Sequence, residues 1–130
     1  MSVRSRLDLR WLVVAAVIGV TAIVVLSWIP GDLRPKTGGG RTLEHACAYF
    51  VVAGVLAVVC PPLRGFLAAC GLVLIAAVLE IGQLWVPGRD ATLSDFLASA
   101  AGALLGAALT TAVARLKAGR HRALPGTRRP

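Results

Sequence analysis

Hydrophobic residues fall into four long runs, and polar residues gather between these runs and at the two ends of the chain. Each run holds about 18 to 22 residues, the length that an α-helix needs to cross roughly 30 Å of hydrocarbon at 1.5 Å per residue. Because lipid offers no hydrogen-bond partner to the backbone, the runs predict helices. We therefore expect an all-α fold, an integral membrane four-helix bundle, with helices at about 11–29, 43–60, 65–86 and 93–114.

The connections between the runs predict which helices are neighbours. The connections at Pro61-Pro62 and at residues 87–92 are short, so the last three helices should form antiparallel pairs in one compact unit. Pro87-Gly88 is typical of a tight turn, because proline presets its own φ and glycine accepts a positive φ. The connection at residues 30–42 contains three consecutive glycines, so we expect it to be flexible and the first helix to be less constrained.

The distribution of charged residues adds a prediction of how the helices are oriented across the membrane. Only 15% of the residues are charged, against about 25% in a typical soluble domain, and the net charge is +8. Ten Arg and Lys residues fall at the termini and near the second connection, against four in the other two connections. The positive-inside rule then predicts that both termini are cytoplasmic (N-in/C-in). The first run has no small-x-small cleavage site after it and is interpreted as a retained helix.

The chain is predicted to be one domain, residues 1–114, followed by a basic and disordered tail, residues 115–130. The tail has no interleaved aromatic residues, so we expect it to contact anionic lipid and not nucleic acid. Cys47, Cys60 and Cys70 all lie in apolar runs without the spacing of metal ligands, and they are interpreted as packing residues. No metal site and no cofactor is predicted.

The last run carries small residues every four positions, including Ala98, Gly102 and Gly106. Small residues let the backbones of membrane helices approach closely. The stripe has two interpretations at this point. It either packs inside the monomer or forms a homo-oligomer through the helix at 93–114.

Polar residues of the last three helices and their connections gather near one predicted end. The candidate site residues are Glu44, His45, Tyr49, Glu80, Gln83, Arg89, Ser94, Asp95 and Ser99. Glu80 is the deepest of them, and ionisable groups inside a membrane helix normally face the bundle interior and pair with another group. We expect its partner to be His45, Arg89 or Tyr49. Several members have a plain explanation as helix-dipole or N-cap residues, so the predicted site rests on the whole set.

These residues occur in the order Glu44-His45-x-x-x-Tyr49, Glu80-x-x-Gln83, Pro87-Gly88-Arg89, Ser94-Asp95, then Gly102 and Gly106. In this order and spacing the chain resembles the VanZ-like family of bacterial membrane proteins over roughly residues 28–110. It departs from the family pattern at Arg41 and Thr42, where the family usually has Asp-Lys, and at Ser99, where it usually has asparagine. The resemblance implies a multi-pass protein of the bacterial cytoplasmic (inner) membrane with a cell-envelope role. The family takes its name from a protein linked to resistance to the glycopeptide teicoplanin, and the resemblance does not imply a particular reaction.

Three functions are compatible with these features, and all of them involve the lipid bilayer as a partner. Our leading interpretation is an outward-facing polar pocket that binds an envelope molecule or a lipid-linked headgroup and contributes to envelope function or teicoplanin tolerance, without catalysis. The second is a membrane enzyme acting on a lipid-linked cell-wall precursor, with His45 as acid or base, supported by Glu80 and Asp95. The third is a structural membrane subunit in which the polar set is an interhelical latch.

Overall fold

A computed structural model describes residues 3–33 and 38–123 of the chain, with side chains for residues 9–33 and 38–120. Its helices are α1 (Val3–Trp28), α2 (Arg41–Val59), α3 (Pro62–Gly82), the short 3₁₀ helix η1 (Gln83–Trp85) and α4 (Leu93–Ala123). The described residues contain no strand, and α1 to α4 are each long and apolar enough to cross a membrane. The predicted all-α, four-helix architecture is therefore confirmed.

The boundaries of the helices differ from the predicted ones mainly at the ends of the chain. α4 continues to Ala123, so residues 115–123, which we predicted to belong to a disordered tail, are helical. This stretch is rich in Ala, Leu, Lys and Arg, which have high helix propensity. Our prediction of disorder rested on its basic charge and did not take this propensity into account. Residues 124–130 of the predicted tail and residues 34–37 of the predicted flexible loop lie outside the described residues.

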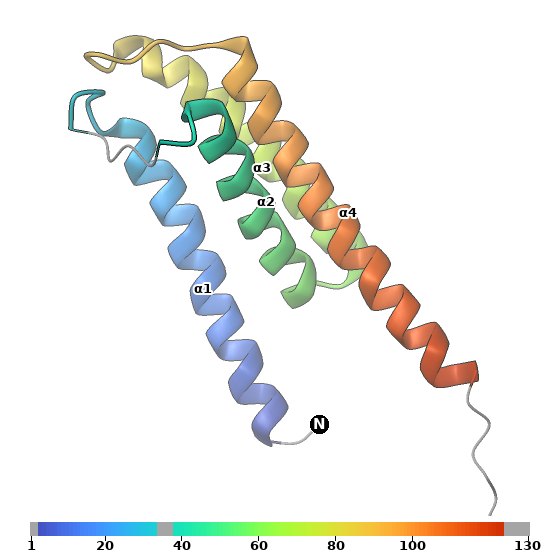
Figure 1. Ribbon diagram of the computed structural model, residues 1–130. Coiled ribbons are helices and arrows are strands. Elements are labelled where there is room, and N and C mark those ends of the chain that lie inside the picture. The colour runs from blue at the N-terminus through green and yellow to red at the C-terminus, as the bar shows by residue number, and fades with distance from the viewer. Residues whose placement is uncertain (1–2, 34–37, 124–130) are drawn as a thin grey trace, which may run out of the picture.

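Helices α2, α3 and α4 pack together, and α1 lies along one side of this group (Figure 1). The most extensive contact joins α2 and α4, which run parallel, while α3 runs in the opposite direction against both. α1 packs mainly on α2 and only slightly on α3. We call the end of the bundle that carries the α1–α2 and α3–α4 connections the polar end. The opposite end, where α1 begins and α4 ends, is the terminal end.

Glycines allow the close packing of α2 against α4. A Cβ atom on Gly102 would lie 2.2 Å from the carbonyl oxygen of Ala46, and one on Gly106 would lie 2.2 Å from that of Phe50. Only a residue without a side chain fits at such distances. The small-residue stripe of α4 therefore packs inside the monomer, and a homo-oligomer through α4 stays a prediction that would require another face of the helix.

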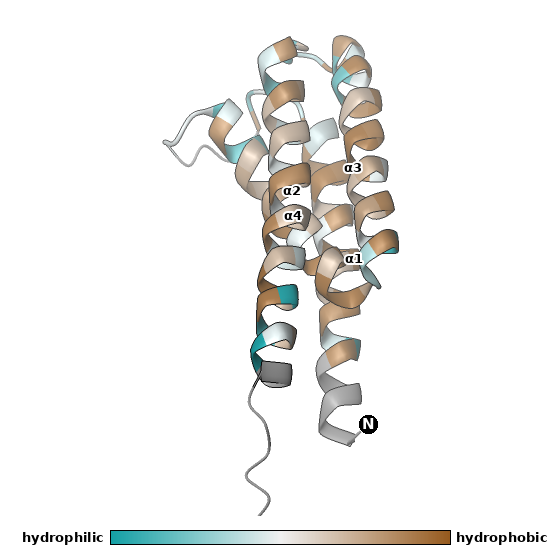
Figure 2. Ribbon diagram, turned by 90° about the vertical axis from the view of Figure 1, so that its right-hand side faces the viewer, coloured by the Kyte–Doolittle hydropathy of each residue, from teal (hydrophilic) through white to brown (hydrophobic). Residues whose placement is uncertain are grey.

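Among the residues with described side chains, many large apolar residues are exposed on the outside of the bundle, and small ones are buried inside it. Ala53, Ala69 and Ala103 are fully buried, whereas Leu74 and Val78 are about two-thirds exposed, at 68% and 67%. Figure 2 shows that hydrophobic residues predominate along the helices. Soluble monomers rarely expose continuous apolar surface on this scale, whereas helices in lipid pack through small residues and turn large ones outward. The fold is consistent with a multi-pass membrane protein.

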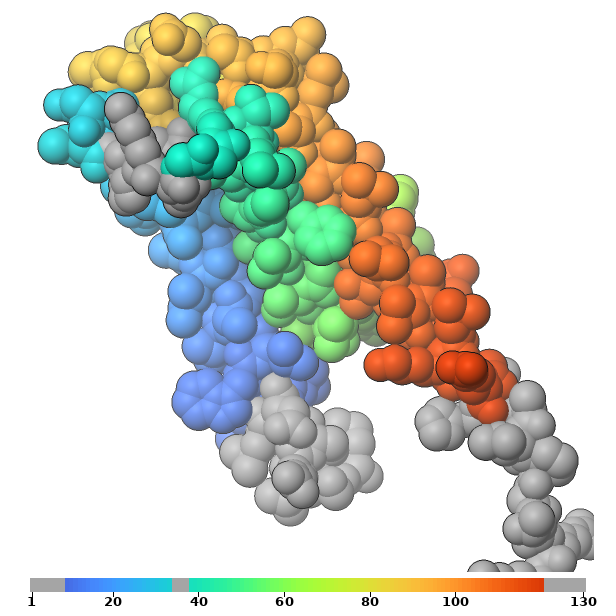
Figure 3. Space-filling model, in the orientation of Figure 1, coloured from blue at the N-terminus to red at the C-terminus, as the bar shows by residue number. Residues whose placement is uncertain are grey.

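The two connections at the polar end touch each other. The backbone N–H of Gly31 donates a hydrogen bond to the carbonyl oxygen of Pro87 at 3.2 Å. Gly88 has a φ of 69°, as the predicted Pro87-Gly88 turn requires. A Cβ atom on Gly31 would come within 1.9 Å of the Gly88 carbonyl oxygen. The segments that follow α1 and α3 are therefore in direct contact, and Figure 3 shows them side by side.

Candidate functional site

Six polar or charged side chains are buried among the described residues, and all of them lie toward the polar end. They are Ser27, Glu80, Gln83, Arg89, Asp95 and Ser99. Buried polar groups are costly unless they are hydrogen-bonded or paired, so each of them raises the question of its partner.

Asp95 ties the first turn of α4 to the first turn of α2. Its Oδ1 atom accepts a hydrogen bond from the hydroxyl of Thr42 at 2.7 Å, and its Oδ2 atom lies 2.5 Å from Nε of Arg41 in an ion pair. The hydroxyl of Thr92 caps α4 by accepting a hydrogen bond from the backbone N–H of Asp95 at 3.3 Å. Asp95 is only 1% exposed, and its charge is balanced by Arg41 inside the protein.

Glu80 joins α3 to the start of α4. Its Oε1 atom accepts a hydrogen bond from the backbone N–H of Thr92 at 2.6 Å. The expected partners were side chains, and this backbone group was not among them. An N–H group at a helix start has no partner within the helix, so the Glu80 carboxylate satisfies a group that would otherwise lack one.

Arg89 holds the C-terminal end of α1. Its Nε atom donates to the carbonyl oxygen of Ile29 at 3.0 Å, and its Nη2 atom donates to that of Leu26. Carbonyl groups at a helix C-terminus lack partners within the helix, and a basic side chain is a favourable donor there. Arg89, a candidate site residue, thus directs at least two of its hydrogen-bond donors to α1.

The remaining candidate residues have different surroundings. Nδ1 of His45 lies 3.3 Å from the hydroxyl of Ser99, which is 2% exposed. The hydroxyl of Ser94 is at the surface and donates to Oγ1 of Thr92 at 3.1 Å. Gln83 is 2% exposed, and neither atom of its side-chain amide has a hydrogen-bond partner in the described part of the chain.

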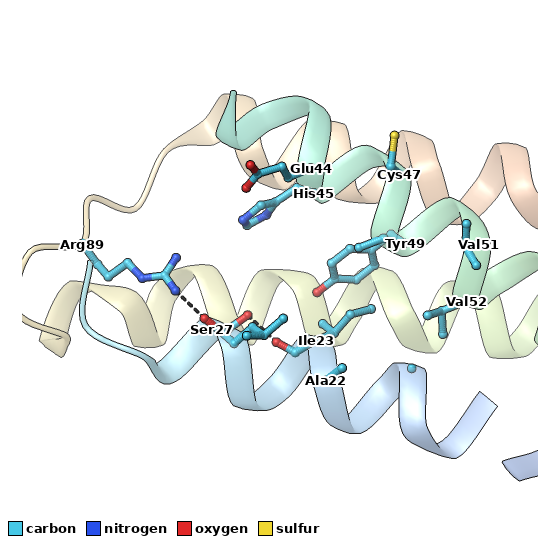
Figure 4. Close-up of a pocket in the computed structure, with 13 residues that line it drawn as sticks. Ala22, Ile23, Ser27, Glu44, His45, Cys47, Tyr49, Val51, Val52 and Arg89 are labelled. Atoms are coloured by element: carbon cyan, nitrogen blue, oxygen red, sulfur yellow. Dashed lines mark hydrogen bonds between the residues drawn. The ribbon is translucent and has the colours of Figure 1, made fainter. Parts of the chain in front are cut away.

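A cavity of about 540 Å³ lies between α1 and α2. Its lining consists of α1 residues between Gly19 and Ser27, α2 residues between Glu44 and Val52, and the side chain of Arg89. Figure 4 shows that the labelled residues are segregated by chemistry. Glu44, His45 and Arg89 lie toward the polar end, and the apolar Val51 and Val52 lie at the other end. The Tyr49 hydroxyl points toward α1 between these two parts.

The structure divides the nine candidate residues into two groups. Four line the cavity: Glu44, His45, Tyr49 and Arg89. The other five lie outside its lining: Glu80, Gln83, Ser94, Asp95 and Ser99. Of these five, Glu80 and Asp95 join helices, whereas Ser99 meets a cavity residue, His45.

Several contributors to this region were not singled out from the sequence as site residues. Arg41 and Thr42 appeared only as departures from a family pattern, yet they bind Asp95. The positive charge of Arg41, opposite to that of Asp95, was the available signal. Ser27 and its α1 neighbours carried no such signal, because a hydroxyl inside an apolar run normally bonds to its own helix, as Ser27 does to the carbonyl oxygen of Ile23.

The side chains in the described part of the chain include no group of three or more His, Cys, Asp and Glu residues that could hold a metal ion. Comparison with models of known families, with characterised proteins and with solved structures finds no match to this chain.

Proposed function

We propose that this chain is a membrane-embedded binding protein of the cell envelope, and that it holds the polar head of an amphiphilic or lipid-linked molecule against Glu44, His45 and Arg89. The observation that carries the proposal is the cavity between α1 and α2, which is charged and polar at one end and apolar along the rest. Its volume of about 540 Å³ lies within the roughly 300–1,000 Å³ of typical ligand sites. Such sites also combine apolar walls with a few polar groups.

Binding explains the arrangement better than catalysis does. The His45–Ser99 pair contains two residue types used in nucleophilic catalysis, but Ser99 is 2% exposed and does not line the cavity. A substrate in the cavity would not reach its hydroxyl, and a nucleophile must contact the atom that it attacks. The acid Asp95 is bound to Thr42 and Arg41 and so is not positioned as a free partner of His45.

A structural latch, our third interpretation, is favoured for part of the polar set. Glu80 bonds to the start of α4, Asp95 to the start of α2, and Arg89 to the end of α1. These contacts join all four helices at the polar end. We propose that the two roles coexist, with Glu80 and Asp95 supporting the frame and Glu44 and His45 facing a ligand.

The resemblance to the VanZ-like family supports an envelope ligand, and the distribution of Arg and Lys supports a polar end that faces outward from the cytoplasmic membrane. Together they favour a lipid-linked cell-wall molecule as the ligand and a contribution to glycopeptide tolerance. The expected cellular result is a change in teicoplanin susceptibility when the gene is deleted, restored by the wild-type chain and not by His45→Ala.

Native mass spectrometry of protein extracted with its surrounding lipid tests the binding directly. We expect a co-purifying amphiphile on the wild-type chain and its loss from His45→Ala and Glu44→Ala. Ser94→Ala serves as the control, because its hydroxyl lies at the surface and outside the cavity, and it should retain the molecule. If both cavity variants carry the same molecules in the same amounts as the wild type, the proposal is wrong.

A further inference from the structure

Two contacts fix the part of α1 that lines the cavity. At one end, Gly19 is so close to α2 that a Cβ atom there would lie 2.7 Å from Cγ2 of Val52. At the other end, Arg89 binds the last carbonyl groups of α1. The lining of α1 between these contacts runs from Gly19 to Ser27, about 12 Å at 1.5 Å per residue.

This part of the cavity is an open groove. Val51 on one wall is 60% exposed and Leu26 on the other is 45% exposed. Both residues belong to segments long and apolar enough to span a membrane. In a bilayer the mouth of the groove would therefore meet lipid hydrocarbon, and a molecule could enter it sideways without passing through water.

We infer that the groove holds one hydrocarbon chain of a bilayer lipid, oriented with its polar head against Glu44 and His45. The inference rests on the proposed function and narrows the amphiphile to a bilayer lipid whose hydrocarbon chain lies in the groove. The chemistry of the lining changes in the same order as that of a lipid, from polar head to hydrocarbon chain. Removing an apolar chain from surrounding lipid has little cost, so contacts at the polar end and close packing along α1 and α2 would provide the selectivity.

A helix of a second protein is the alternative occupant. It would be about 10 Å wide and would meet the α1 lining over only about 12 Å, roughly two helical turns. A single extended hydrocarbon chain is much thinner. The narrowness of the groove follows from the small residues Gly19 and Ala22, which allow α1 to lie close to α2.

Photolabelling in nanodiscs tests the inference. The probes are phosphatidylglycerol, phosphatidylethanolamine and phosphatidylcholine, each with a diazirine in one acyl chain, present at a few per cent in phosphatidylcholine discs. Ala22→Trp fills the groove and leaves Glu44 and His45 in place. Val25→Trp is the matched control, because Val25 is on the same helix, is 53% exposed and does not line the cavity.

We expect acyl-chain labels on α1 and α2 groove residues in the wild type and in Val25→Trp, and loss of most of this labelling in Ala22→Trp. Unchanged labelling of Ala22→Trp would overturn the inference. So would a wild-type dimer in native mass spectrometry that is lost in Ala22→Trp, because the groove would then hold a second copy of the chain.

The headgroup proposal can fail separately. We expect the wild type to label more strongly with one of the three lipids and His45→Ala to lose that preference while its groove residues are still labelled. His45→Ala could instead keep the wild-type preference among the three lipids while Ala22→Trp abolishes labelling. The groove would then still be the site of the acyl chain, and headgroup recognition by His45 would be wrong.

Discussion

Gln83 differs from its buried polar neighbours at the scale of a single residue. Glu80 and Asp95 each have hydrogen-bond partners, whereas neither amide atom of Gln83 has one among the described residues. A buried polar group without a partner costs about 1–3 kcal/mol. The unpartnered amide of Gln83 should therefore lower the stability of the folded protein.

Replacing Gln83 with methionine should therefore stabilise the protein. Methionine has a similar shape without the polar amide, and we expect a gain of about 1 kcal/mol in the free energy of unfolding. Reversible unfolding in mixed detergent micelles measures it, with Leu84→Met, at an exposed neighbouring position, as a control that should change little. A loss of stability in Gln83→Met would show that the amide makes a favourable contact in the folded protein.

Arg89 is also specific as a residue type, because its planar fork reaches two carbonyl groups from one side chain. Lysine presents a single ammonium group and should hold α1 less well. In Arg89→Lys we expect faster hydrogen exchange of backbone amides near the end of α1, roughly tenfold if about 1.4 kcal/mol of local stability is lost.

Hydrogen-exchange mass spectrometry of peptides covering residues 20–33 is the measurement for Arg89→Lys. Asp90→Asn changes an exposed neighbour in the same connection and should leave the exchange near the wild-type rate. Exchange in Arg89→Lys that matches the control would contradict the role of Arg89 as an anchor of α1.

At the scale of elements, the pairing of α2 with α4 depends on glycine. Gly106→Ala places a methyl group against the Phe50 carbonyl oxygen, and α2 and α4 would have to separate. We expect a loss of about 1–3 kcal/mol in the free energy of unfolding. Gly71→Ala on α3 is the matched control, because nothing lies within 4 Å of its Cβ position, and it should be neutral or gain up to about 1 kcal/mol. Equal effects of the two substitutions would rule out the close contact.

The junction of α3 with α4 depends on an oxygen acceptor at residue 80. Glu80→Leu leaves the Thr92 N–H without its acceptor and should cost about 1–3 kcal/mol. Glu80→Gln keeps a carbonyl oxygen in the same place and should cost less than half as much. Thermal unfolding of the two variants in the same detergent compares them, and a larger loss in Glu80→Gln would mean that the negative charge is the more important feature.

The sequence was informative about elements wherever one rule dominated. Hydrophobic length predicted the four helices, and the Pro87-Gly88 pair predicted the turn with a positive φ at Gly88. It was less informative where two interactions compete. The spacing of Gly102 and Gly106 fits either packing in the monomer or oligomerisation, and only the position of α2 distinguishes them. The partner of Glu80 was missed because a backbone N–H carries no sequence signal.

At the scale of the whole molecule, the charge count predicts which end of the bundle faces the cytoplasm. Asp90 is exposed at the polar end, and Arg115 is exposed near the terminal end. With the three native cysteines replaced by alanine, we expect Asp90→Cys to react with a membrane-impermeant maleimide in intact cells. Arg115→Cys should react only after the cells are opened. The reverse pattern would show that the polar end faces the cytoplasm.

The position of α1 could not be predicted from sequence, and the cavity depends on it. A long connection follows α1, and its run is apolar without a marked face, so many placements beside the other helices are compatible with the pattern. Long-range contacts position α1 in the structure, among them Gly19 with Val52, Gly31 with Pro87, and Arg89 with the end of the helix. Each joins positions far apart in the chain.

The short length of α2 has a consequence for the membrane itself. α2 has 19 residues, about 28 Å, and its first turn already contains Arg41 and Glu44, so its apolar part is shorter than a hydrocarbon layer of roughly 30 Å. Such a mismatch is relieved when the bilayer becomes thinner beside the helix. α2 contacts all three other helices, so any thinning would be confined to its small lipid-facing side. We expect the leaflet to be locally thinner at the mouth of the cavity, so that lipid headgroups and water come closer to Glu44 and His45 there.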